Sequence, residues 1–171
     1  MTNEYRHIPV LLSECIEALH LSEGQTYVDA TLGGAGHSLE VAKHIGRTGH
    51  LIGIDQDAVA RKAARERLEA LPEAIRPEID VVEGNFGDLD ALLVAAQIPS
   101  IDAILFDLGV SSVQIDTPAR GFSFKETGPL DMRMDQRQEK TARDIVEVRK
   151  LKANLVSVNI DKLVNEGYLV R

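Results

Sequence analysis

One stretch constrains this chain more than any other: Tyr27-Val-Asp-Ala-Thr-Leu-Gly-Gly-Ala-Gly-His37. Its first half is rich in β-branched and aromatic residues, which favours a short buried strand. Three glycines, at 33, 34 and 36, then permit tight turns and a close approach of the backbone to a ligand. The residues from Ser38 to Lys43 are typical of a helix start. A strand, a glycine turn and a helix N-terminus together present backbone N–H groups to an anion or carboxylate, so we predict a nucleotide-like ligand at this turn.

The length and composition are those of one soluble globular domain, with or without an appendage. The 171 residues are 44% hydrophobic and 27% charged, enough to bury one sizeable core. No apolar run approaches the ~18–20 residues that cross a bilayer, and the N-terminus shows no secretory or organellar signal. We therefore expect a cytoplasmic protein without a membrane partner. A single cysteine, Cys15, excludes an internal disulfide and a cysteine-based zinc cluster, and no metal site is expected.

Predicted strands alternate with predicted helices along the first 108 residues. Strands are expected at 26–30, 50–55, 79–83 and 101–107, and helices at 13–19, 38–45, 58–71 and 89–96. Ser13 and Asp57 are the expected N-caps of the first and third helices. Such alternation predicts βαβ units, and hence an α/β fold with a parallel sheet.

Carboxylates lie at the ends of three of the predicted strands, at Asp29, Asp55 and Asp107. Ligands of α/β sheets bind beyond the carboxyl ends of the strands, and a carboxylate at the place of Asp55 can accept both ribose hydroxyls of an adenosine. A single example is more often an exposed loop carboxylate. Three at successive strand ends favour a shared binding site.

The glycine turn fits a sulfonium cofactor better than a dinucleotide. Leu39 stands where a dinucleotide fingerprint has its third glycine, and no Gly-Lys-Ser/Thr of a phosphate loop follows. The acid before the glycines, Asp29, resembles the first motif of S-adenosylmethionine-dependent methyltransferases. A nicotinamide-dependent oxidoreductase is therefore the less favoured alternative. His37 is not expected to act as a base, because a positive helix end disfavours imidazolium.

Two further sites carry candidate chemistry. Phe86, after the third predicted strand, is placed to lie against an adenine face. The pattern is equally consistent with Phe86 packing in the core. Asp107-Leu-Gly-Val-Ser-Ser112 occupies the place where methyltransferases acting on exocyclic amines hold the target nitrogen. Because that lone pair is conjugated with the ring, an acceptor for its N–H can draw the nitrogen toward tetrahedral geometry. Asp107 is therefore the predicted catalytic residue.

The character of the chain changes after Gly109. Residues 109–135 are irregular, and a loop of that length is typically functional. Helical character is expected again at Thr141–Glu147. Residues 118–152 hold nine Lys or Arg against six Asp or Glu, on a chain whose net charge is −8. This basic segment is equally consistent with a solvated face and with a phosphate-contacting patch.

Six motifs resemble one family in their order and spacing. They are His7-Ile-Pro-Val-Leu-Leu12, Asp29-Ala-Thr-Leu-Gly-Gly-Ala-Gly-His37, Gly53-Ile-Asp-Gln-Asp57, Asp107-Leu-Gly-Val-Ser-Ser112, the run from Gln114 to Phe124, and Gly128-Pro-Leu-Asp-Met-Arg-Met-Asp135. Over residues 5–147 the chain resembles the bacterial small-subunit ribosomal RNA cytosine-N4 methyltransferases (the RsmH or MraW family). The resemblance implies a Rossmann-like methyltransferase fold and transfer of a methyl group to N4 of a cytidine in small-subunit ribosomal RNA.

The same resemblance implies a set of residues that bind S-adenosylmethionine. They are Ala35, Gly36, His37, Asp55, Phe86, Asp107 and Gln114. Ala35 stands where the family often has glycine, a mild change if backbone N–H groups do the binding. The basic loop from 120 to 149 would meet RNA phosphates, and Phe122 or Phe124 would either stack on an extruded base or anchor the loop.

The predicted organisation is a cofactor-binding methyltransferase core at 1–108, a family-specific loop and the start of an inserted helical domain at 109–147, and an unassigned tail at 148–171. Family members are longer, so we expect a sheet that is incomplete at its C-terminal strands. The fourth strand would then be an exposed edge, covered by residues 156–160 or by a homodimer. The alternative to an active enzyme is a catalytically impaired cofactor-binding module of the same family.

Overall fold

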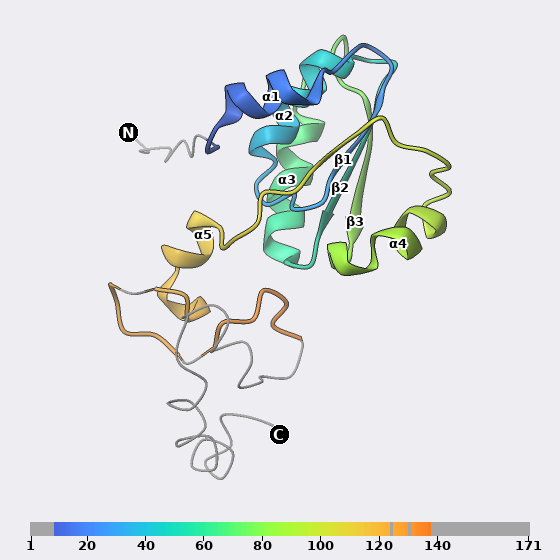
Figure 1. Ribbon diagram of the computed structural model, residues 1–171. Helices are drawn as coiled ribbons and strands as arrows, with labels where there is room; N and C mark the ends of the chain where they lie inside the picture. The colour runs from blue at the N-terminus through green and yellow to red at the C-terminus, as the bar shows by residue number, and fades with distance from the viewer. Residues whose placement is uncertain (1–8, 124, 130, 138–171) are drawn as a thin grey trace. The chain divides into compact units, whose positions relative to one another are not determined.

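The computed structural model describes residues 9–123, 125–129 and 131–137. The chain divides into two compact units, one of residues 1–108 and one of residues 109–171. The first unit holds the sheet and the helices that cover it (Figure 1). The second holds short helices and turns, and each unit is described below by itself.

A four-stranded parallel sheet forms the centre of the first unit. Its strands are β1 (Thr26–Asp29), β2 (His50–Asp55), β3 (Glu78–Glu83) and β4 (Ala103–Leu105), in the order β3-β2-β1-β4. Val28 of β1 lies opposite Ile52 of β2 and Ile104 of β4. The predicted α/β fold with a parallel, Rossmann-like sheet is confirmed. Within the described ranges no strand follows β4, which is three residues long and shorter than the predicted 101–107.

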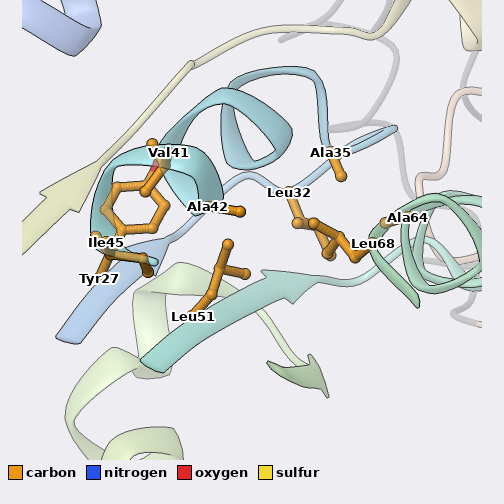
Figure 2. Packing of buried hydrophobic residues seen from close by; sticks show 9 residues of the cluster. All are labelled: Tyr27, Leu32, Ala35, Val41, Ala42, Ile45, Leu51, Ala64 and Leu68. Carbon is orange, nitrogen blue, oxygen red and sulfur yellow. The ribbon is translucent and has the colours of Figure 1, made fainter. Parts of the chain in front are cut away.

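Helices cover both faces of this sheet (Figure 1). They are α1 (Leu12–Leu19), α2 (Gly36–Ile45), α3 (Ala58–Glu69) and α4 (Leu89–Ala95), with a short 3₁₀ helix, η1 (Phe86–Asp88), before α4. Because successive strand residues face opposite ways, Tyr27 packs with α2 and α3 while Val28 packs with α4. Figure 2 shows the first of these clusters, with Tyr27 beside Val41 and Ile45.

Two helix starts test the predicted caps. Asp57 precedes α3 and accepts a hydrogen bond from the Val59 amide at 2.9 Å, as predicted. The Ser13 cap is wrong, because α1 begins one residue earlier, after Leu11 in a left-handed conformation (φ 53°) and without a side-chain cap. In the part of the chain that the structure describes, no helix has both the length and the apolarity needed to cross a membrane.

The second unit is organised by local caps and one buried arginine. Among its described residues, the helical elements are α5 (Ser112–Ile115) and η2 (Pro118–Arg120). The Arg120 guanidinium is buried and donates to the carbonyl oxygens of Arg133 (3.3 Å) and Met134 (2.9 Å). Phe122 is 1% exposed, so its ring is not available for the predicted stacking on a base, and its burial favours the alternative role of an anchor. Phe124, the helix expected at 141–147 and the stretch 156–160 lie outside the described residues.

Candidate functional site

The turn between β1 and α2 passes through two left-handed residues. Gly33 has φ 50° and Ala35, which precedes α2, has φ 59°. That conformation costs a residue with a Cβ about 1–2 kcal/mol. Burial of the Ala35 methyl group beside Leu32 and Leu68 offsets part of this cost (Figure 2). Ala35 supplies no side-chain cap, so the first-turn amides of α2 form an electropositive helix end suited to a carboxylate.

The N-terminal segment packs over this helix end. A Cβ on Gly36 would lie 2.5 Å from Cγ of Pro9, so this contact by itself favours glycine at position 36. Nε2 of the buried His37 lies 3.2 Å from the carbonyl oxygen of Val10. Both predicted site residues therefore also position the chain ahead of α1.

Asp29 joins β1 to the first turn of α2. It is 2% exposed and accepts hydrogen bonds from the Ser38 hydroxyl at 2.6 Å and from the Thr31 amide at 3.2 Å. Burial raises the pKa of this carboxyl, and the two hydrogen bonds oppose part of that rise. Asp29 thus holds the glycine turn from inside the fold.

Asp55 holds the same turn from β2. One carboxylate oxygen accepts from the Gly33 amide and the other from the Asp57 amide, both at 2.8 Å. Burial raises the pKa of the Asp55 carboxyl, and these hydrogen bonds oppose the rise. Each carboxylate oxygen can accept a second hydrogen bond, so the capacity to receive two ribose hydroxyls remains.

Asp107 lies two residues beyond β4 and is tied to the loop that follows β1. Its amide donates to the Thr31 hydroxyl at 2.7 Å, while its carboxylate is 58% exposed and lies 3.8 Å from Nδ1 of His37. The strand order reverses between β1 and β4, and this reversal is where open α/β sheets bind ligands. The predicted catalytic carboxylate therefore stands at that point.

Phe86 opens η1 after β3, and its ring is partly exposed. The ring meets that of Phe106 edge to face, with centroids 5.9 Å apart and planes at 88°. Sequence reasoning missed Phe106, and also Thr31 and Ser38 as anchors. The only available signal for Phe106 was its place directly before Asp107.

Gln114 is the one predicted site residue in the second unit; the other six lie in the first. Its side-chain oxygen accepts from the Ser111 amide at 3.0 Å, and Ser111 caps α5 in return. This reciprocal capping box gives Gln114 a local structural role. Within the described ranges, no cluster of three or more His, Cys, Asp or Glu is arranged to hold a metal ion.

Two arginines of the basic segment already have carboxylate partners. Arg133 pairs with Asp131 at 2.6 Å, and Arg137 pairs with Asp135 at 2.8 Å. The charge that this part of the segment offers to phosphates is reduced accordingly.

A model of the MraW methylase family matches residues 4–166. The chain belongs to this family. The match reaches past residue 147, farther than the motifs alone predicted.

Curated relatives agree with this assignment. The chain is 51% identical over 144 residues to ribosomal RNA small subunit methyltransferase H 2 of Agathobacter rectalis, covering 84% of this chain and 45% of the relative. It is 48% identical over 141 residues to ribosomal RNA small subunit methyltransferase H of Mycoplasma mycoides, covering 82% of this chain and 44% of the relative. The chain spans less than half the length of these relatives. Among solved structures, a protein-L-isoaspartate O-methyltransferase overlaps 60% of this chain and 30% of its own, with 16% identity and a TM-score of 0.45.

Proposed function

We propose that this chain transfers a methyl group from S-adenosylmethionine to N4 of a cytidine in small-subunit ribosomal RNA. The observation that carries the proposal is the hydrogen-bonded junction of the glycine turn with Asp55 and Asp107, in a member of the MraW methylase family. The relatives' names supply the ribosomal RNA substrate, and the exposed carboxylate of Asp107 suits an exocyclic amine.

The residues of the turn fit S-adenosylmethionine. The N-terminus of α2, at Gly36 and His37, has no side-chain cap and suits the carboxylate of the methionine moiety. Asp55 has the remaining acceptor capacity for the ribose hydroxyls, and Phe86 offers a partly exposed ring to the adenine. Ala35 supplies the left-handed residue directly before the first turn of α2.

Chemically, the bound cofactor supplies an electrophilic methyl group on sulfur. Asp107 accepts a hydrogen bond from an N–H of the target amine, which increases the lone-pair density on that nitrogen as it attacks. The N–C bond would form as the S–C bond breaks, and Asp107 would take the proton that the methylated nitrogen releases. The Thr31 hydroxyl fixes the Asp107 backbone, so the carboxylate is held in place for the attack. Gln114, which lies in the second unit, remains a proposed cofactor contact.

The proposed partner is ribosomal RNA within the small ribosomal subunit, and the proposed compartment is the cytoplasm, where such subunits are assembled. Within the second unit, Arg120 donates to the Met134 carbonyl oxygen and Arg133 pairs with Asp131. The basic residues of the segment, Lys125 among them, would meet the RNA phosphates.

We further propose a homodimer through the outer edge of β4. Among the described residues β4 pairs with β1 alone, and Leu108 beside it is exposed. Sedimentation equilibrium at micromolar concentration is expected to show a dimer, and a monomer throughout would contradict it.

A methyl-transfer assay tests the proposed reaction. Tritiated S-adenosylmethionine and undermodified small subunits are expected to yield N4-methylcytidine after nucleoside digestion. Asp107→Ala is expected to abolish the label, whereas Asp90→Asn, on the exposed face of α4, preserves it. Label that survives Asp107→Ala would contradict the assignment. Cofactor binding without any transfer by the unaltered chain would favour the impaired binding module.

A further inference from the structure

Phe86 and Phe106 form an exposed aromatic pair at the carboxyl end of the sheet. Phe86 opens η1 after β3, and Phe106 directly follows β4 and precedes Asp107. Their ring centroids lie 5.9 Å apart, with the planes at 88°. The two side chains are 42% and 44% exposed, so each keeps a large part of its ring in water.

Core packing does not account for this pair. Among the described residues, neither ring belongs to the two clusters that fill the faces of the sheet, nor to the apolar side chains packed against them. Aromatic surface left in water forfeits the stabilisation that burial would give. The pair lies at the carboxyl end of the sheet, where α/β folds bind ligands, so the exposed aromatic surface is placed to contact a ligand.

We propose that Phe106 is a positioning residue that holds the Phe86 ring in the orientation that receives the adenine of the cofactor. The proposal rests on the proposed function, because it assigns Phe86 to the adenine. An edge-to-face pair is favoured because the positive edge of one ring meets the negative face of the other. Whichever ring supplies the edge, Phe106 covers at most one face of Phe86, and Phe86 is 42% exposed.

The contact lowers the cost of binding. A free phenylalanine side chain loses rotamer freedom when a ligand packs against it. Phe106 restricts the Phe86 ring before the ligand arrives, so less freedom is lost on binding. The effect of Phe106 on affinity must therefore pass through Phe86, and this dependence separates a positioning role from direct contact.

A double-mutant cycle measured by calorimetry with S-adenosylhomocysteine tests this dependence. Phe106→Leu is expected to weaken binding about two- to tenfold, the range of an aromatic pair contact. Phe86→Leu is expected to weaken it about tenfold. In the Phe86→Leu background, Phe106→Leu is expected to have no further effect. Phe106→Tyr retains the ring and is expected to restore affinity, and Val94→Ala, an exposed apolar change on α4, serves as the matched control.

Three results would overturn the inference. The first is an unchanged affinity in Phe106→Leu. The second is an equal loss of affinity from Phe106→Leu with and without Phe86→Leu, which would mean that Phe106 contacts the ligand directly or affects the fold in general. In either case the unaltered chain still binds, so the proposed function stands. Absence of binding by the unaltered chain overturns the proposed function, and the inference with it. Thermal unfolding of each ligand-free variant confirms that it is folded.

Discussion

Single residues at the site are held by partners that lie far away in the sequence. Thr31 and Asp107 are 76 positions apart, yet the Thr31 hydroxyl accepts a hydrogen bond from the Asp107 amide. The sequence predicts Asp55 and Asp107 because carboxylates at strand ends form a pattern. It does not predict Thr31 or Phe106, because their roles depend on which strands lie side by side.

Thr31→Val tests the anchoring of Asp107. The change removes the acceptor for the Asp107 amide while keeping the shape of the side chain. Loss of one hydrogen bond, about 1 kcal/mol, is expected to lower kcat about fivefold with little change in cofactor affinity. Thr31→Ser retains the hydroxyl and is expected to keep kcat. Equal kcat in the valine variant and the unaltered chain would refute the anchoring role.

The raised pKa of Asp55 predicts a pH dependence of cofactor affinity. Ionised Asp55 accepts the ribose hydroxyls, so affinity is expected to fall as the pH drops through its pKa, which burial places above the usual ~3.9. Below that pKa the decrease approaches about tenfold per pH unit. Calorimetry from pH 7 downward measures it. In Asp55→Asn the dependence should vanish, and a dependence that persists there would assign it to another group.

At the level of elements, hydrophobic periodicity places the strands and helices well, but capping depends on the tertiary fold. Asp57 caps α3 as predicted because its carboxylate needs only the local Val59 amide. Ser13 does not cap α1, since the chain enters that helix from a left-handed Leu11. β4 is shorter than its apolar run, because its pairing with β1 ends at Leu105.

Ser38→Ala tests the link between β1 and α2. The variant removes the hydroxyl that donates to the buried Asp29, and loss of such a bond to a charged group costs about 1.5–3 kcal/mol. Burial raises the pKa of Asp29, the Ser38 hydroxyl favours its ionised form, and that form becomes more populated as the pH rises. The loss in the free energy of unfolding, measured with urea, is therefore expected to be larger at pH 7 than near pH 4. Equal losses at both values would show that Ser38 does not stabilise the ionised carboxylate.

For the whole molecule, the two units, which meet between Leu108 and Gly109, differ in how well their structure can be predicted from the sequence. In the first unit predicted strands alternate with predicted helices, and glycines mark several of the turns, so its fold can be predicted from the sequence. The second unit is held by contacts without periodicity, such as the Arg120 guanidinium on two carbonyl oxygens. The sequence left both stacking on a base and anchoring of the loop open for Phe122, and its burial favours anchoring.

The central claim is that the glycine turn and Asp55 hold S-adenosylmethionine, and calorimetry on the full chain tests it most directly. The unaltered chain is expected to bind S-adenosylmethionine at one site and to show no heat with NAD. Asp55→Asn should weaken binding at least about tenfold, through the loss of charge-assisted bonds to the ribose. Asp90→Asn, an exposed carboxylate on α4, should leave affinity unchanged. Binding of NAD alone, or equal affinity in Asp55→Asn and the unaltered chain, would contradict the account.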